Sequence, residues 1–138
     1  MNTSMPNIRL KYHHTALLVE KIKEAREHYQ ELFGSHNISP VYTVTSQKVR
    51  VCFVRNGKDS FIELVEPETD DSPVLNLLKK KFSYYHLGYK VKNIKNAVIL
   101  LEKLNYKALE FYNSEAFEGK LCIFLYTPQG HLIELIEN

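Results

Sequence analysis

The sequence predicts an α+β fold built from two tandem βαβββ modules. Two observations predict it. The segment YHHTALLVEKIKEA, which starts at Tyr12, resembles YYHLGYKVKNIKNA, which starts at Tyr84, at an offset of 72 residues. The segment VCFVRNGKDSFIELVEP resembles CIFLYTPQGHLIELIEN at an offset of 71 residues. Two matches in the same order and at nearly the same offset indicate an internal repeat rather than a chance likeness between two βα units.

The first module begins with a strand that we expect over residues 10–19. An amphipathic helix follows, because Ile22, Ala25 and Tyr29 recur at helical spacing and Gly34 is a natural C-terminal stop. The segment RNGKD predicts a hairpin turn between the last two strands of the module. We expect these later strands over residues 40–45, 48–55 and 60–66.

The second module repeats this order, with its last hairpin at TPQG. We expect a strand over 84–91, a helix over 94–104, and strands over 106–112, 120–126 and 131–137. A short helix between the modules is predicted by DDSPVLNLLKK, with Ser72 as its N-cap and Pro73 in its first turn. The expected organisation is one domain over 10–138, made of module one (10–67), a linker helix (72–81) and module two (82–138).

Composition narrows the functional classes. The chain has 138 residues, 44% of them hydrophobic and 25% charged, which is typical of a globular protein. A net charge of +2 is too small to favour a nucleic-acid partner, and the basic run at Lys79–Lys81 is interpreted as a solvated helix end. We expect no signal peptide, no membrane association, a cytoplasmic location, and buried free thiols at Cys52 and Cys122.

The polar residues that the repeat duplicates inside strands are His14 with His86 and Glu63 with Glu134. Strand periodicity places each of the four among apolar or small neighbours, with Tyr12 on the face of His14 and Tyr84 on that of His86. A buried carboxylate without a partner costs several kcal/mol. Two imidazoles and two carboxylates that converge between the modules would satisfy one another by binding a divalent metal. Nitrogen and oxygen ligands without sulfur favour Mn, Fe, Co, Ni or Zn.

Other polar residues are assigned to the surface. Glu66 and Glu137 are also duplicated, but they alternate away from Glu63 and Glu134 and are interpreted as solvated strand ends. His13 alternates out of the His14 face and is expected at the surface. The same surface position is expected for the histidines without a repeat partner, which are His28, His36 and His131.

From HHTALLVEKIKEAREHYQELFG to TPQGHLIELIEN, the chain resembles the vicinal oxygen chelate superfamily, which includes glyoxalase I and methylmalonyl-CoA epimerase. The resemblance implies paired βαβββ modules whose mixed sheets curl around a metal site, the glyoxalase/bleomycin-resistance-like fold. It implies His14, Glu63, His86 and Glu134 as the metal ligands. A homodimer is common in the family and is expected here.

The resemblance also implies a metal-dependent isomerase or lyase. Its substrate would carry oxygens on adjacent or nearby carbons, as in a thioester or a hemithioacetal, and would bind the metal through both. The metal would stabilise the enediolate that forms when the neighbouring C–H is deprotonated. Glu134 is implied to leave the metal and take the proton, whereas Glu63 stays bound or serves as the base on the opposite face.

Two segments point to different members of the superfamily. IELVEPETDDSP resembles methylmalonyl-CoA epimerase, and YTPQGHLIELIE resembles glyoxalase I. The chain departs from both patterns: Leu18 and Pro67 stand where glyoxalase I has arginine and asparagine, and Ser46 and Gln47 stand where the epimerase has a second glutamate base. We expect an epimerase-like activity, with a glyoxalase I-like lactoylglutathione lyase and a small-molecule binding or resistance protein as alternatives.

The segment EFYNSEAFEG is not periodic, and its aromatic residues Tyr112 and Phe117 are expected to be exposed. Two interpretations stay open for it, a loop that contacts substrate and an ordinary surface loop. An iron oxygenase of the same superfamily is a third functional class, but its usual members are much longer than this chain.

Overall fold

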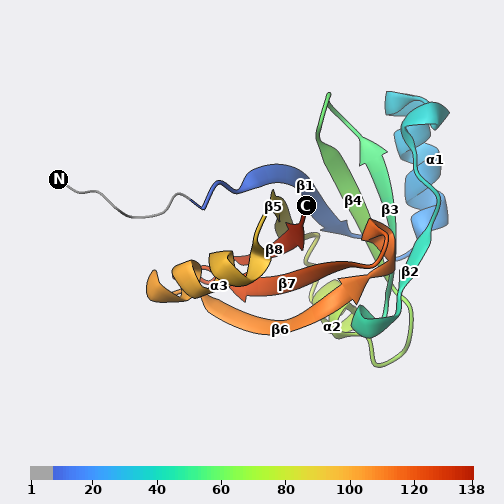
Figure 1. Ribbon diagram of the computed structural model, residues 1–138. Helices are drawn as coiled ribbons and strands as arrows, with labels where there is room; N and C mark the ends of the chain where they lie inside the picture. The colour runs from blue at the N-terminus through green and yellow to red at the C-terminus, as the bar shows by residue number, and fades with distance from the viewer. Residues whose placement is uncertain (1–7) are drawn as a thin grey trace.

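The computed structural model describes residues 8–138, which form one eight-stranded mixed sheet with helices on its outer face (Figure 1). The strands follow the order β2-β3-β4-β1-β5-β8-β7-β6. Their bounds are β1 Lys11–Leu18, β2 Tyr42–Val44, β3 Val49–Arg55, β4 Phe61–Pro67, β5 Tyr84–Val91, β6 Lys107–Ser114, β7 Lys120–Tyr126 and β8 Leu132–Glu137. The helices are α1 Ile22–Phe33, α2 Pro73–Lys79 and α3 Ile94–Lys103.

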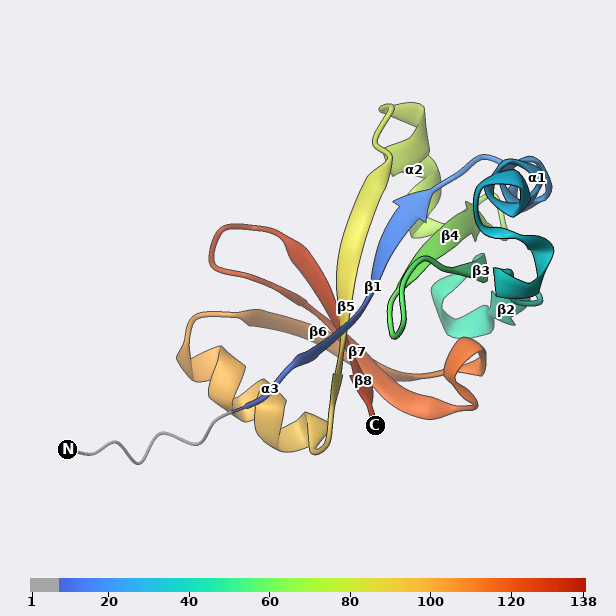
Figure 2. The ribbon, with the colours of Figure 1, turned by 90° about the horizontal axis from the view of Figure 1, so that it is seen from above.

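The strand order has the symmetry of a duplicated module. β1 pairs with β4 in parallel, β5 pairs with β8 in parallel, and β1 and β5 meet antiparallel in the middle of the sheet. The first module therefore forms one half of the sheet, β2-β3-β4-β1, and the second module forms the other half, β5-β8-β7-β6. The two halves join where β1 pairs with β5 (Figure 2). This arrangement confirms the predicted pair of βαβββ modules.

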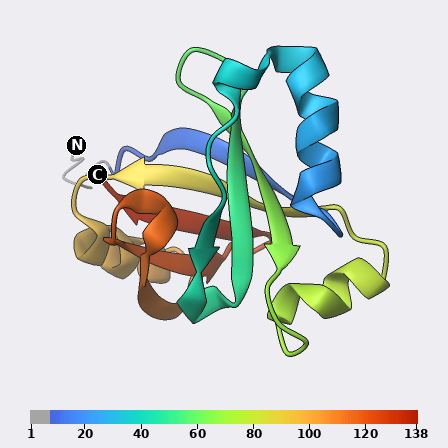
Figure 3. The ribbon, with the colours of Figure 1, turned by 90° about the vertical axis from the view of Figure 1, so that its right-hand side faces the viewer.

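Each module covers the outer face of its half of the sheet with its own helix. α1 packs on β3 and β4 through Ile22, Cys52 and Leu64, and α3 packs on the second module through Ile94, Leu101 and Leu135. The inner face forms a third apolar cluster that draws on both modules. Figure 3 shows α2 beyond the end of β4, where it leads the chain from the first module to the second.

The sheet curls so that its two edges meet. Two short 3-10 helices, η2 (Thr45–Gln47) and η3 (Glu115–Phe117), follow the edge strands β2 and β6. η3 packs against β2 and η2 against β6. The Thr45 backbone N–H donates a hydrogen bond to Oε2 of Glu115 at 3.2 Å, which joins the two segments. The curled inner face is thus closed at this edge.

Helix termini confirm one prediction and overturn another. Gly34 ends α1 with a positive φ of 86°, as expected for a C-terminal stop. The interpretation of Glu66 and Glu137 as solvated strand ends is wrong. Glu66 accepts the Ile22 N–H at 2.8 Å and Glu137 accepts the Ile94 N–H at 3.2 Å, so each carboxylate caps the first turn of its module's helix.

Two smaller expectations also fail. Tyr12 and Tyr84 do not share the buried faces of His14 and His86, because the pairing of β1 with β5 shifts register between Tyr12 and His14 and again between Ala16 and Leu17. Both rings are exposed as a result. Ser72 occupies the N-cap position of α2, but its hydroxyl makes no capping hydrogen bond.

Several other surface and core assignments agree with the structure. Cys52 and Cys122 are buried free thiols. The three lysines at the end of α2 are exposed, as are the histidines without a repeat partner, His28, His36 and His131. Among the described residues, no helix is both long and apolar enough to cross a membrane.

Candidate metal centre

The four duplicated polar residues lie on the four central strands. His14 is on β1, Glu63 on β4, His86 on β5 and Glu134 on β8. Strand register brings them together: Ala16 pairs with both Glu63 and His86, and Gly88 pairs with both His14 and Glu134. All four side chains point to the inner face and are buried, with at most 5% of each residue exposed.

Their ligand atoms converge on one point. Nε2 of His14 lies 3.1 Å from Nε2 of His86, 3.2 Å from Oε1 of Glu63 and 3.3 Å from Oε1 of Glu134. Nε2 of His86 lies 3.3 and 3.4 Å from the same two carboxylate oxygens. One ligand atom from each residue therefore falls within 4.8 Å of the other three.

The donor set fits a divalent metal. Ligands about 2.1 Å from an ion in tetrahedral or octahedral geometry lie about 3.0 to 3.4 Å from their neighbours, which matches the separations found here. Oε1 of Glu63 and Oε1 of Glu134 are buried and accept no hydrogen bond from the described residues. Buried carboxylate oxygens need a cation or a donor, and an ion at this point would serve both.

The electrostatics show how strongly the four groups depend on one another. Burial alone would lower the pKa of His14, but the adjacent carboxylates of Glu63 and Glu134 outweigh it and raise the pKa to about 10. The pKa of His86 is raised by the same carboxylates against the effect of burial. Burial would raise the pKa values of the two glutamates, yet the histidines hold both below the ordinary value. Without a metal, the cluster is held together by imidazolium–carboxylate pairs.

His13 orients the first of these ligands, and its predicted surface position is wrong. Its Nδ1 lies 2.8 Å from Nδ1 of His14. The His13 ring is half-buried against the aromatic rings of Phe53, Phe61 and Phe117. Burial and the positive charge of His14 lower the pKa of His13 to about 4, so it is neutral near pH 7. At the repeat offset of 72, His13 corresponds to Tyr85, whose ring packs on His86. This correspondence is the feature of the sequence that could have placed His13 next to the centre.

A glycine makes room for the His14 ring. A Cβ atom at Gly88 would lie only 2.0 Å from Cε1 and 2.4 Å from Nε2 of His14. Because such contacts are far below van der Waals distance, a side chain at residue 88 would push His14 away from its present position. Gly88 is the β5 residue between His14 and Glu134, so the absence of a side chain there shapes the centre.

The second module adds a tyrosine that the sequence did not place correctly. β6 continues to Ser114, so Tyr112 belongs to a strand and not to an exposed loop. Its ring is buried and stacks on Phe124 with the centroids 5.6 Å apart, and its hydroxyl donates a hydrogen bond to Oε2 of Glu134. Burial and the Glu134 charge raise the pKa of Tyr112 well above its usual value, so the hydroxyl keeps its proton. Phe117 is partly buried against the same inner face.

The cavity beside the centre is small, about 20 Å³, and lies between the two modules. Its lining is mostly apolar and includes Val44, Val51, Val65 and Phe124, together with the polar residues Gln47 and Ser114. The carboxylates that line it are those of Glu63 and Glu134. A substrate larger than a water molecule would reach the centre only if the segments around it move apart.

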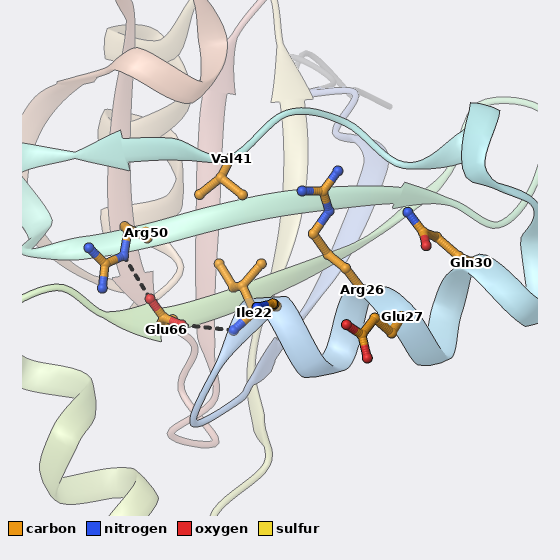
Figure 4. Close-up of a pocket in the computed structure, with 8 residues that line it drawn as sticks. Ile22, Arg26, Glu27, Gln30, Val41, Arg50 and Glu66 are labelled. Carbon is orange, nitrogen blue, oxygen red and sulfur yellow. Dashed lines mark hydrogen bonds and ion pairs between the residues drawn. The ribbon is translucent and has the colours of Figure 1, made fainter.

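A larger cavity of about 440 Å³ lies on the other face of the sheet, between α1 and β3 (Figure 4). Arg26 and Gln30 extend into it from α1, and Glu66 links the Ile22 N–H to Arg50 at its floor. None of the four converging side chains lines this cavity. We therefore place the candidate site at the inner face, where the duplicated residues meet.

Residues 13–137 match the profile of the glyoxalase/bleomycin resistance protein/dioxygenase superfamily. The chain belongs to this superfamily. The match spans all four converging side chains and both modules, and the curled eight-stranded sheet is the fold of its structural neighbours. The superfamily and the fold predicted from the sequence are thus confirmed.

Members of the superfamily similar to this chain include methylmalonyl-CoA epimerases. The mitochondrial enzyme of Dictyostelium discoideum is 31% identical over 132 residues, covering 93% of this chain and 78% of that protein. The uncharacterised protein YqjC of Bacillus subtilis is 31% identical over 127 residues, covering 90% and 89% of the two chains.

Among solved structures, the methylmalonyl-CoA epimerase of Mycobacterium tuberculosis superposes with a TM-score of 0.81 at 20% identity, over 92% of this chain and 87% of that one. A methylmalonyl-CoA epimerase in complex with methylmalonyl-CoA and an ammonium ion superposes with a TM-score of 0.80 at 19% identity, over 96% of both chains. These two likenesses bear on the fold alone.

Proposed function

We propose that this chain is a metal-dependent enzyme that removes and returns a proton next to a thioester carbonyl, in the manner of a methylmalonyl-CoA epimerase. The observation that carries the proposal is the pair of buried carboxylate oxygens, Oε1 of Glu63 and Oε1 of Glu134. Neither makes a hydrogen bond with the described residues, and both lie 3.2 to 3.4 Å from two imidazole nitrogens. A divalent Co, Ni, Mn, Zn or Fe ion held by His14, Glu63, His86 and Glu134 would satisfy all four groups.

The relatives support the substrate class. The match to the methylmalonyl-CoA epimerase of Dictyostelium discoideum, at 31% identity, covers 93% of this chain. A metal bound at this centre would act as a Lewis acid toward the carbonyl oxygens of a bound substrate and stabilise the negative charge left when the α proton is removed. The thioester and the α carbon would lie in the apolar cavity between the modules.

Proton transfer then falls to the chain's own carboxylates. Glu134 is our proposed proton acceptor, because its Oε1 faces the centre while its Oε2 is held by Tyr112. Ser46 and Gln47 lie in η2 and supply no second carboxylate. Glu63 is the other carboxylate in the lining of the cavity and reaches the centre from the other module, so we assign to it the return of the proton on the opposite face.

Deuterium exchange tests this proposal. Protein loaded with Co²⁺ or Mn²⁺ is expected to exchange the α proton of methylmalonyl-CoA for deuterium from D₂O and to interconvert the two epimers. Glu134→Gln is expected to lose exchange from the epimer whose α proton faces Glu134, and to lose interconversion. Glu63→Gln is expected to retain exchange from one epimer but to lose interconversion. Failure of metal-loaded wild-type protein to exchange the α proton would rule out the epimerase assignment.

A further inference from the structure

The two halves of the centre differ at one pair of tyrosines. Tyr112 pairs with Cys122 across β6 and β7, two residues before the Phe124–Glu134 pair across β7 and β8. In the first module, Tyr42 pairs with Val51, two residues before the Phe53–Glu63 pair. Tyr42 and Tyr112 therefore occupy equivalent positions next to the two equivalent glutamates.

Only the second tyrosine reaches its glutamate within the described part of the chain. The Tyr112 hydroxyl donates to Oε2 of Glu134. Tyr42 is half-buried against the inner apolar cluster and makes no hydrogen bond to Glu63. The polar contacts of the Glu63 carboxylate in residues 8–138 are those with the two histidines. The duplicated carboxylates are thus held differently.

The contact with Tyr112 gives the two carboxylate oxygens of Glu134 different partners. Oε2 is held by the hydroxyl, and Oε1 lies 3.3 and 3.4 Å from the two histidine nitrogens. A carboxylate held in this way can rotate Oε1 from the centre toward a substrate while Oε2 keeps its partner. A general base is effective only when its oxygen stays oriented toward the reacting proton and within hydrogen-bond distance of it.

We propose that Tyr112 is a positioning residue that aims Glu134 at the α proton on its own face of the substrate. The inference rests on the proposed function, since it assigns a role within the same centre. Stacking on Phe124, with an angle of 17° between the rings, fixes the tyrosine ring, so the hydroxyl itself is held in a defined position. Groups that orient a metal ligand commonly change metal affinity 10- to 100-fold when removed.

The test compares Tyr112→Phe with Tyr42→Phe. Both variants keep the aromatic ring and remove one hydroxyl, and Tyr42 provides the matched control because it occupies the equivalent position without touching its glutamate. The visible absorption spectrum of bound Co²⁺ and its dissociation constant are measured for each, followed by kcat and KM for α-proton exchange. The spectrum reports the arrangement of the ligands and needs no substrate.

Tyr112→Phe is expected to alter the Co²⁺ spectrum, weaken Co²⁺ binding by about 10-fold or more, and lower kcat with little change in KM. Tyr42→Phe is expected to match wild type in all three measurements. An unchanged spectrum and kcat in Tyr112→Phe would overturn the inference, as would equal losses in both variants. Wild-type protein that binds Co²⁺ but does not exchange methylmalonyl-CoA would contradict the proposed function alone, because the spectral comparison between the two variants still decides the role of Tyr112.

Discussion

Oε1 of Glu63 and Oε1 of Glu134 are buried and make no hydrogen bond with the described residues. The sequence predicted both residues because the repeat duplicates them inside otherwise apolar strands. It could not predict how their neighbours are placed. His13 and Tyr112 act through contacts that depend on a local register shift in β1 and on the extent of β6. Neither feature follows from the alternation of apolar and polar residues.

Gly88→Ala tests whether the His14 ring needs the space over β5. The added Cβ would lie 2.0 Å from Cε1 of His14, so the ring must move. We expect the variant to lose about 1–3 kcal/mol of stability and to bind Co²⁺ at least 10-fold more weakly. Titration with Co²⁺ and urea unfolding measure the two effects. Tyr89 lies on the same strand but packs on the outer face, against the apolar cluster under α3, so Tyr89→Phe should bind Co²⁺ as wild type does.

Metal binding is expected to release protons. In the metal-free protein the pKa of His14 is about 10, above its ordinary value, so the ring is protonated at pH 7. A metal binds only neutral imidazole, and at least one proton must therefore leave. Between pH 6 and pH 9, Co²⁺ affinity should rise about tenfold per pH unit for each proton released. Calorimetry in buffers of different ionisation enthalpy counts the released protons, and a release of zero would show that His14 is neutral before binding.

At the scale of elements, the strands that carry Glu63 and Glu134 also carry a second glutamate that caps the helix of the same module. Glu66, the second-last residue of β4, caps α1, and Glu137, the last residue of β8, caps α3. The sequence showed the duplication of these residues but not their role, because each partner lies more than forty positions away along the chain. Such contacts arise only when the end of a strand and the start of a helix meet in the folded module.

Removing one of these caps should destabilise the protein modestly. We expect Glu137→Ala to lose about 1 kcal/mol of unfolding free energy, because the Ile94 N–H at the start of α3 loses its acceptor. Urea unfolding measures the change. Glu110→Ala, an exposed position on β6, is the control and should stay within about 0.5 kcal/mol of wild type.

The segments η2 and η3 are expected to control access to the centre. The cavity there is about 20 Å³, and the Thr45 N–H bond to Glu115 joins the two segments next to Val44 and Ser114, which line it. Because the loss of one hydrogen bond is worth about 0.5–1.5 kcal/mol, Glu115→Ala should speed the removal of Co²⁺ by a chelator roughly 2- to 10-fold. Stopped-flow absorbance follows the removal. The same rate in wild type and variant would show that metal leaves by another route.

At the scale of the whole molecule, the pseudo-twofold relation between modules made most of the architecture predictable. The order of elements, the hairpins and the meeting of the four duplicated side chains all follow from one repeat. Departures from the repeat could not be predicted in this way. Tyr42 and Tyr112 share a position and differ in their contacts, which depend on the packing of each half of the inner face. Metal binding, the homodimer and the cytoplasmic location remain predictions.

The central claim is that His14, Glu63, His86 and Glu134 hold one divalent metal ion. Elemental analysis of the purified protein, combined with a Co²⁺ titration of the chelator-treated protein, tests it most directly. We predict one ion per chain, a fall in the unfolding midpoint when the ion is removed, and loss of high-affinity Co²⁺ binding in His14→Ala and His86→Ala. A chain that purifies without metal, binds no Co²⁺ and unfolds at the same midpoint with and without chelator would contradict the account.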